Sequence, residues 1–181
     1  MSATAQLHGL DLPSPWVRRF APLIRAGGSV LDVACGAGRH ARYLAGLGHR
    51  VEAVDRDAGV LLELADVAGV TTRHADLEHG PWPYSGRQFD AVVVTNYLHQ
   101  PLLPRLLEAL ADGGVLIYET FAAGNERYGR PANPDFLLKP GELLDLTRGR
   151  LQVIAYEDLH VETPRPAMIQ RVCAVNQPAR A

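Results

Sequence analysis

The chain has 181 residues, of which 47% are hydrophobic, and a formal charge of −2 at pH 7. This length predicts a single domain over residues 1–181 with a sizeable core, and the charge gives no global reason to expect nucleic acid or an anionic membrane as a partner. The two cysteines do not suggest a disulfide framework, residues 1–6 do not resemble a secretory signal, and no apolar stretch approaches bilayer length. A cytoplasmic location without membrane contact is therefore expected.

The predicted elements begin with an amphipathic helix over residues 13–25, inside an N-terminal helical cap over residues 1–28. Strands and helices then alternate. Strands are expected over residues 29–33, 50–54, 70–74, 89–95 and 115–120, and helices over residues 39–47, 58–68 and 102–110. The run FDAVVVT at 89–95 is typical of a strand that is buried on both faces.

The alternation stops at residue 120. Residues 121–140 are rich in Gly, Pro, Asn and charge and are long for a plain connection, so they are a candidate substrate loop or lid. A short helix over 141–146 and two strand-like segments over 151–159 and 168–176 follow, and the short connection between those segments favours an antiparallel pair. The predicted fold class is α/β, with a doubly wound, mostly parallel seven-stranded sheet and a C-terminal antiparallel hairpin.

The most informative segment is residues 29–44, SVLDVACGAGRHARYL. An apolar strand carries Asp32, breaks into a turn of small residues, and restarts as a helical pattern. Gly36 and Gly38 have no side chain, so a ligand can approach the backbone amides of this turn closely. A carboxylate at the mouth of such a turn predicts a nucleotide-like ligand that carries a positive charge.

Three acidic residues, Asp32, Asp55 and Asp76, stand at the ends of successive predicted strands. The carboxyl ends of parallel strands line one crevice at the switch point of the sheet. A carboxylate after the second strand suits the two hydroxyls of a ribose, and one after the third can accept a bond from the exocyclic amine of adenine. A single aspartate there is more often a turn former or helix cap, but three beside two glycines favour a ligand crevice.

These segments resemble the class I S-adenosylmethionine-dependent methyltransferases over nearly the whole chain. The resemblance is carried by LDVACGAGRHARYLA, VEAVD, HADLE, FDAVVVTNYLHQ and ADGGVLIYETF. The segment FAAGNERYGRPANPDFLLKPGELL is also similar to small bacterial methyltransferases of the tellurite-resistance type. The family often has a glycine where this chain has Ala34. The resemblance implies a Rossmann-like methyltransferase fold and transfer of a methyl group from S-adenosyl-L-methionine to an acceptor, with S-adenosyl-L-homocysteine as product.

The resemblance also implies which residues hold this cofactor. Asp32 would hold the ammonium group, directly or through water, and Asp55 would take the ribose hydroxyls. Asp76 would meet the adenine edge, and Asn96 would lie near the sulfonium. The full set is Asp32, Ala34, Cys35, Gly36, Gly38, Asp55, Arg56, Asp76, Leu77 and Asn96.

A nicotinamide dinucleotide-binding domain is the rival interpretation, because the residues from Gly36 to Ala41 fit G-x-G-x-x-G/A and an acid follows about 20 residues later. A pyrophosphate would bring negative charge close to Asp32, whereas an ammonium and a sulfonium bring positive charge. At about 4 Å and an effective dielectric constant near 20, the Coulomb energy is roughly 4 kcal/mol, which attracts a cation to Asp32 and repels an anion from it. Electrostatics therefore favours methyl transfer. A protein that binds the cofactor without turnover is a further alternative.

Catalytic residues are harder to predict, because an in-line displacement on a sulfonium needs a base only if the acceptor must lose a proton. His99, Tyr97 and Glu119 follow the fourth and fifth strands and are the candidate bases. His99 is favoured because histidine is the residue type that titrates closest to neutral pH, although a lone histidine after a strand is more often structural. The histidines and cysteines lack the spacing of metal ligands, so no metal is expected.

The acceptor is predicted to contact the 121–140 loop through Arg127, Tyr128 and Arg130, since arginines attract anions. The alternative is a solvated surface loop. The sequence TNYL at 95–98 differs from the Asn/Asp-Pro-Pro-Tyr/Phe element typical of adenine- or cytosine-directed enzymes, and no basic domain is appended. A small-molecule acceptor is therefore preferred over nucleic acid, while the accepting atom and the oligomeric state stay open.

Overall fold

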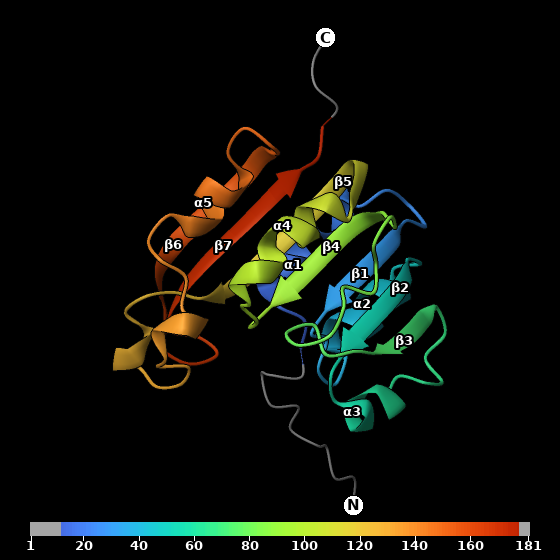
Figure 1. Cartoon of the computed structure of the whole chain (residues 1–181), viewed down its shortest axis with the longest axis horizontal. Helices are drawn as coiled ribbons and strands as arrows, with labels where there is room; N and C mark the ends of the chain where they lie inside the picture. The colour runs from blue at the N-terminus through green and yellow to red at the C-terminus, as the bar shows by residue number, and fades with distance from the viewer. Residues whose placement is uncertain (1–11, 178–181) are drawn as a thin grey trace, which may run out of the picture.

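The computed structural model describes residues 12–177, and its strands form one seven-stranded sheet of order β3-β2-β1-β4-β5-β7-β6 (Figure 1). The strands are β1 (Ser29–Val33), β2 (Arg50–Asp55), β3 (Val70–His74), β4 (Phe89–Thr95), β5 (Leu110–Phe121), β6 (Gln152–Val161) and β7 (Ala167–Val175). The first five strands pair in parallel, and β7 is antiparallel to both β5 and β6. The predicted fold class is confirmed; residues 1–11 of the expected N-terminal cap lie outside the described residues.

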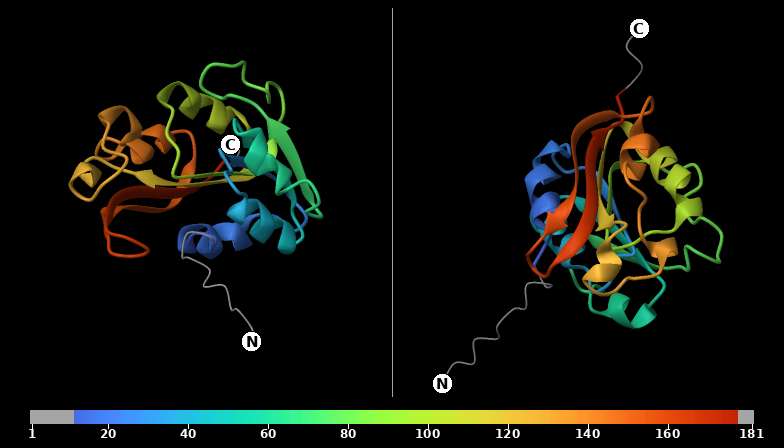
Figure 2. Two further views of the ribbon diagram at one scale, coloured as in Figure 1. Left: turned by 90° about the horizontal axis from the view of Figure 1, so that it is seen from below. Right: turned by 90° about the vertical axis from the view of Figure 1, so that its left-hand side faces the viewer.

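Helices cover both faces of the sheet (Figures 1 and 2). One face is covered by α1 (Pro15–Phe20) with the 3₁₀ turn η1 (Ala21–Leu23), by α2 (Arg39–Gly46) and by α3 (Ala58–Leu62). The other is covered by η2 (Gln100–Leu102), α4 (Leu103–Glu108) and α5 (Glu142–Thr147). Two further 3₁₀ turns, η3 (Asn125–Arg127) and η4 (Pro134–Phe136), lie in the loop after β5. Because both faces are covered, β1 and β4 are buried almost throughout.

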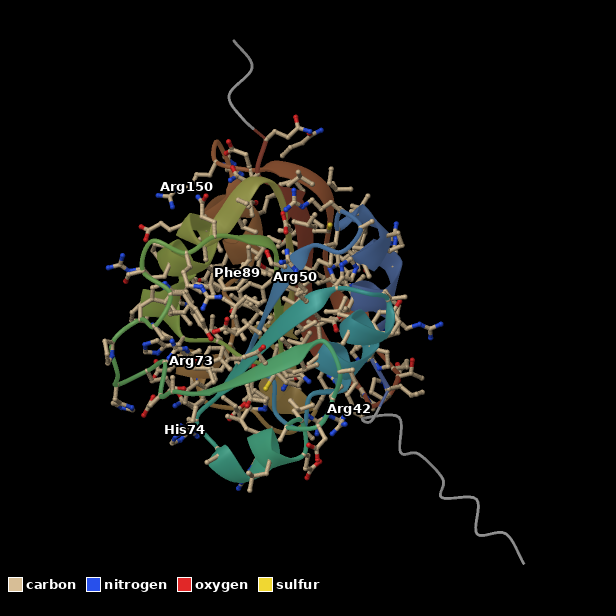
Figure 3. All side chains as sticks on the ribbon, turned by 90° about the vertical axis from the view of Figure 1, so that its right-hand side faces the viewer. Arg42, Arg50, Arg73, His74, Phe89 and Arg150 are labelled. Carbon is tan, nitrogen blue, oxygen red and sulfur yellow. The ribbon has the colours of Figure 1, made fainter. Side chains whose placement is uncertain are left out.

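The edge strand β3 is polar and carries Arg73 and His74 (Figure 3). Arg73 lies 3.5 Å from a carboxylate oxygen of Glu52 on β2, and Glu52 also accepts two hydrogen bonds from Arg87, at 3.1 and 2.6 Å. Charged side chains on an edge strand discourage pairing with a further strand. This side of the sheet is thus closed by side chains rather than by another element.

Two element boundaries differ markedly from those predicted. The helix expected over residues 58–68 ends at Leu62, and the chain continues as tight turns. The Arg42 guanidinium donates a hydrogen bond to the backbone carbonyl of Glu63 at 2.7 Å, so this carbonyl is bonded outside the helix. Strand β5 begins at Leu110, which pairs with Phe89, so the glycine pair at 113–114 lies within the strand. In the terminal hairpin it is β7, the last strand, that is inserted between β5 and β6.

Candidate functional site

Two strained turns mark the carboxyl ends of β1 and β4, the neighbouring strands at which the strand order reverses. Ala34 has φ 51° and Asn96 has φ 55°, and within residues 12–177 these are the non-glycine residues with positive φ. Alanine in this conformation costs about 1 kcal/mol, whereas asparagine tolerates it better. Strained backbone of this kind clusters at functional sites.

The glycine turn after β1 is open on one side and tightly packed on the other. A Cβ added to Gly36 would meet nothing within 4 Å, whereas one added to Gly38 would come within 2.4 Å of Leu64. Asp55, at the end of β2, fixes the turn, since its Oδ2 accepts the N–H of Gly36 at 2.9 Å and its Oδ1 that of Asp57 at 2.9 Å. Gly36 therefore faces space that a ligand can use, and Gly38 allows α2 to approach the segment after α3.

Three hollows meet at these turns. The turn pocket, about 560 Å³, lies over the glycine turn and reaches His40 and Thr95. The strand-end pocket, about 140 Å³, lies over the ends of β2 and β3 and includes Asp55 and Asp76. The aromatic pocket, about 280 Å³, is lined by Tyr97, Leu98, Phe121, Pro131 and Phe136. The three pockets share lining residues and adjoin one another as parts of one cleft. Ala34 is common to the turn pocket and the strand-end pocket, and Asn96 to the turn pocket and the aromatic pocket. The strand-end pocket and the aromatic pocket share Arg56, Glu78 and Tyr97.

The cleft brings together most of the residues predicted to hold a cofactor. The turn pocket and the strand-end pocket are lined by Ala34, Cys35, Gly36, Asp55, Arg56, Asp76, Leu77 and Asn96. Asp32 and Gly38 belong to neither lining and lie behind the turn. Their influence on a ligand would therefore pass through the backbone or the electrostatic field.

Asp32 is the most unusual ionisable group of the site. The residue is 1% exposed, and its Oδ2 has no hydrogen-bond partner. Burial raises the pKa of Asp32 to about 7, although the amide of Ala41 and the charge of Arg39 act in the opposite direction. A buried carboxylate with an unpartnered oxygen is costly, and a nearby cation would reduce that cost.

Asp76 and Tyr97 face the strand-end pocket with different chemistry. Hydrogen bonds from the amides of Glu78 and His79, at 2.9 and 3.1 Å, hold the pKa of Asp76 below its usual range. The Tyr97 hydroxyl is buried without a partner, and burial together with the charges of Glu78 and Asp76 raises its pKa. Asp76 is thus an ionised acceptor, and Tyr97 is a neutral hydroxyl that can donate a hydrogen bond but cannot serve as a base near neutral pH.

The two other candidate bases do not reach the cleft. Glu119 accepts hydrogen bonds from the Ser14 hydroxyl at 2.7 Å and from Arg171 at 3.0 Å, and both contacts tie up its carboxylate. His99 is partly buried, caps the start of η2 through its backbone carbonyl, and lines none of the three pockets. A role for His99 in proton transfer stays a prediction.

The predicted substrate residues Arg127, Tyr128 and Arg130 are exposed and line none of the three pockets. The centroid of the Tyr128 ring lies 4.6 Å from that of the His160 ring. The same loop instead contributes Pro131 and Phe136 to the aromatic pocket. An apolar ring in an otherwise polar loop was the signal that could have identified this contribution.

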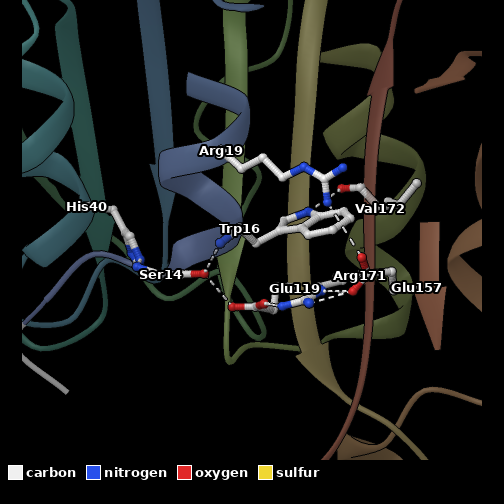
Figure 4. A network of polar contacts seen from close by, with 8 residues as sticks. All are labelled: Ser14, Trp16, Arg19, His40, Glu119, Glu157, Arg171 and Val172. Atoms are coloured by element: carbon white, nitrogen blue, oxygen red, sulfur yellow. Dashed lines mark hydrogen bonds and ion pairs between the residues drawn. The ribbon is translucent and has the colours of Figure 1, made fainter. Parts of the chain in front are cut away.

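A polar network that the sequence did not reveal joins α1 to the wall of the turn pocket (Figure 4). The N–H of Ser14, the N-cap of α1, donates to Nε2 of His40 at 3.1 Å. Burial lowers the pKa of His40 to about 3, so the ring is neutral. Because Nε2 accepts from an amide, the ring proton is on Nδ1, which lies 3.2 Å from the Thr95 hydroxyl. His40 therefore connects the N-terminal helix to the residue before Asn96.

Within residues 12–177, no group of three or more His, Cys, Asp or Glu side chains is placed to hold a metal ion. Over the same residues, no helix has the length and apolar character needed to cross a membrane.

Comparison with known proteins gives consistent results. Residues 30–114 match the family model described as a methyltransferase domain. The chain is 34% identical over 106 residues to the protein-L-isoaspartate O-methyltransferase of Chlorobaculum tepidum, an alignment that covers 55% of this chain and 48% of that protein. The chain thus spans about half the length of the curated relatives it matches.

Solved structures of methyltransferases are similar in fold. TehB from Haemophilus influenzae superposes with a TM-score of 0.75 at 19% identity, over 89% of this chain and 61% of that one. A TehB-like SAM-dependent methyltransferase from Corynebacterium glutamicum superposes with a TM-score of 0.65 at 20% identity, over 90% and 87%. At such identities the likeness establishes the fold alone.

Proposed function

We propose that the chain, whose residues 30–114 match a methyltransferase domain, belongs to the class I S-adenosylmethionine-dependent family and transfers a methyl group from S-adenosyl-L-methionine to a small-molecule acceptor. The product of the cofactor would be S-adenosyl-L-homocysteine. One observation carries the proposal: a glycine turn, Asp55 at the end of β2 and Asp76 after β3 line a cleft that includes an aromatic pocket, and Asp32 of β1 is buried behind the turn.

The residues present fit this cofactor. Gly36 leaves open space above the turn, and Asp55 and Asp76 offer carboxylate oxygens to hydroxyl and amine donors. The unpartnered oxygen of Asp32 beneath the turn favours a ligand with positive charge. A dinucleotide fits less well, because its pyrophosphate would add negative charge next to Asp32 and Asp55.

When bound, S-adenosylmethionine supplies a methyl group that its sulfonium has already activated. The protein's contribution is to orient donor and acceptor, and such alignment is worth effective molarities of about 10⁵ M or more. Asn96 borders both the turn pocket and the aromatic pocket, and Tyr97 borders both the strand-end pocket and the aromatic pocket. These two residues would therefore hold the acceptor in line with the methyl group.

A protein acceptor is the second candidate, since the Chlorobaculum relatives are named for one. The aromatic pocket of about 280 Å³ is at the small end of ligand pockets, which favours a small molecule. A protein that binds the cofactor without turnover would have the same cleft. The release of S-adenosylhomocysteine in the presence of an acceptor separates that alternative from an enzyme.

Calorimetric titration tests the cofactor assignment. We expect S-adenosylmethionine and S-adenosylhomocysteine to bind and Asp55→Asn to weaken both by about tenfold, because the ribose would lose a charged acceptor. Asp112→Asn, an exposed acid of β5 outside the three pockets, is the matched control and should leave binding unchanged. Tight binding of NADH without binding of either sulfur compound would contradict the proposal.

Two variants of His40 separate its two hydrogen bonds. His40→Gln places an oxygen where Nε2 accepts from Ser14 but removes the donor to Thr95, and we expect cofactor affinity to fall about fivefold with little loss of stability. His40→Asn keeps a donor near Thr95 but leaves the buried Ser14 amide unpaired. We expect that variant to lose about 1–2 kcal/mol of stability and to keep near-normal affinity.

Thermal unfolding and calorimetric titration of both variants give the two readouts. If His40 had only a structural role, the free energy of unfolding and the affinity for the cofactor would fall together in both variants. That result would exclude a positioning role for His40 at the turn pocket.

A further inference from the structure

We propose that the methyl acceptor is a small amine that binds in the aromatic pocket and is methylated on nitrogen. This inference rests on the proposed function, because it assigns a substrate class to the same cleft. It is carried by the rings that line the pocket, by the charge at its border, and by the position of the candidate bases.

The lining of the pocket has the chemistry that recognises cationic nitrogen. Three aromatic residues, Tyr97, Phe121 and Phe136, contribute to a hollow of about 280 Å³. Aromatic faces attract ammonium and guanidinium groups through the ring quadrupole. Phe121 already does so, since the guanidinium carbon of Arg165 lies 5.6 Å from its ring centroid. The small volume limits the acceptor to one ring or a short chain.

The charge at the border of the pocket favours a cation over an anion. The Glu78 side chain is 24% exposed, while its partner Arg56 is 67% exposed and 3.9 Å away. Arg56 lines the same pocket, but the Glu78 carboxylate is the more buried of the two, so solvent screens its charge less. The arginines of the loop, Arg127 and Arg130, lie outside the lining. A carboxylate or oxyanion acceptor would therefore meet the less screened charge of Glu78, and the cation that the lining offers it, Arg56, lies mostly in solvent.

The chemistry of amine methylation agrees with this charge distribution. The bound ammonium first gives one proton to solvent, and the lone pair of the neutral amine then forms the N–C bond while the S–C bond breaks and its electron pair returns to sulfur, giving a thioether and an alkylated ammonium. The positive charge thus moves from sulfur to nitrogen, into the aromatic pocket and towards Glu78. The new ammonium then loses its proton to solvent. A hydroxyl acceptor would instead need a base, and Glu119 and His99 do not line the pocket.

A matched set of ligands tests the inference on the complex of the full chain with S-adenosylhomocysteine. Benzylamine, benzyl alcohol and benzoate share one ring and differ in the charge of the head group. By calorimetry we expect benzylamine to bind at least tenfold more tightly than benzoate, with the alcohol between them. Glu78→Gln should remove the preference for the amine and leave the affinity for the alcohol unchanged. Equal or tighter binding of benzoate, or no binding of any of the three, would overturn the proposal.

Two further variants and one reaction complete the test. Phe136→Ala should weaken the binding of benzylamine at least fivefold and change the affinity for S-adenosylhomocysteine by no more than about twofold. The reason is that Phe136 lines the aromatic pocket and neither of the other two pockets. Leu47→Ala is the control, since Leu47 is 50% exposed, close to the 47% of Phe136, and lies outside the three pockets. With S-adenosylmethionine, we expect N-methylbenzylamine to form. Failure of S-adenosylhomocysteine to bind would instead count against the proposed function itself.

Discussion

Replacement of Asp32 by asparagine is expected to stabilise the unliganded protein near pH 8 and, at the same time, to weaken its binding of S-adenosylmethionine. Burial raises the pKa of Asp32 from an ordinary 3.8 to about 7. At any pH between these two pKa values, Asp32 is therefore mostly protonated in the folded state and mostly ionised in the unfolded state. Ionising the buried group costs roughly 4 kcal/mol of folding stability above pH 7, as an upper bound.

The sign of the pH dependence follows from this difference. Because the folded state binds more protons, stability falls as pH rises from about 4 to about 7 and then levels off. Asparagine removes the ionisation but brings an amide that also needs partners, so we expect a net gain of about 1–3 kcal/mol near pH 8 and none near pH 4. Unfolding in urea at the two pH values measures both quantities.

Asp90→Asn is the matched control for Asp32. Asp90 is also largely buried, at 9% exposure, but its Oδ2 accepts the N–H and the hydroxyl of Ser29 at 2.7 and 2.9 Å. Although burial raises its pKa, these bonds and Arg25 hold the pKa of Asp90 below its usual range. Its replacement should therefore destabilise the protein at the pH where Asp32→Asn stabilises it. The same sign for both variants would contradict our account of Asp32.

Ligand binding reports the functional side of Asp32. A cation above the turn lowers the pKa of the carboxylate beneath it, so binding releases a proton and affinity should increase between about pH 6 and pH 8. In Asp32→Asn this increase should disappear, and affinity near pH 8 should be about tenfold lower than in the native protein. Titration in buffers of different ionisation enthalpy detects the proton directly. The buried carboxylate would thus be retained for binding at the expense of stability.

The sequence predicted the parts of the site that depend on local pattern and strand order. A glycine turn after a buried strand and acids at successive strand ends are short-range signals, and parallel strands bring them to one edge. The charged residues of the 121–140 loop did not indicate which part of the loop lines the cleft. The arginines at 127 and 130 are exposed to solvent, whereas Phe136 lines the aromatic pocket. Long-range contacts such as Ser14 with His40 had no sequence signal.

The row of charges across the last strands also depended on topology. Arg171 of β7 is in register with Glu119 of β5 on one side and with Glu157 of β6 on the other. This arrangement exists only because β7 lies between β5 and β6, whereas sequence order would place β6 next to β5. Glu119 was accordingly a candidate base in the sequence and is a structural acceptor in the fold.

Replacement of Arg171 by methionine is expected to cost about 2–4 kcal/mol of folding stability, somewhat below the loss when one member of a fully buried ion pair is removed, because this network is partly buried. The Arg171 side chain is 19% exposed, and those of Glu119 and Glu157 are 13% and 28% exposed. Its guanidinium carbon lies 4.6 Å from the ring centroid of Trp16, which is itself 2% exposed (Figure 4). The variant leaves Glu119 without its cation and Glu157 with Arg19 alone, at 3.6 Å, while methionine still packs beneath the ring.

The melting temperature should fall by roughly 10 °C, since about 1 kcal/mol corresponds to about 2–4 °C in a chain of this size. Arg105→Met is the control, because Arg105 pairs with Glu108 in solvent and its loss should cost less than about 0.5 kcal/mol. Adding Glu119→Gln and Glu157→Gln to Arg171→Met should recover much of the loss, as the uncompensated charges are gone. No recovery would mean that packing against Trp16, and not charge, dominates the loss of stability.

The same variants should also change cofactor binding. Glu119 accepts a hydrogen bond from Ser14, and Ser14 in turn donates one to His40 at the turn pocket. We therefore expect Arg171→Met to weaken cofactor binding and the triple variant to restore it only in part.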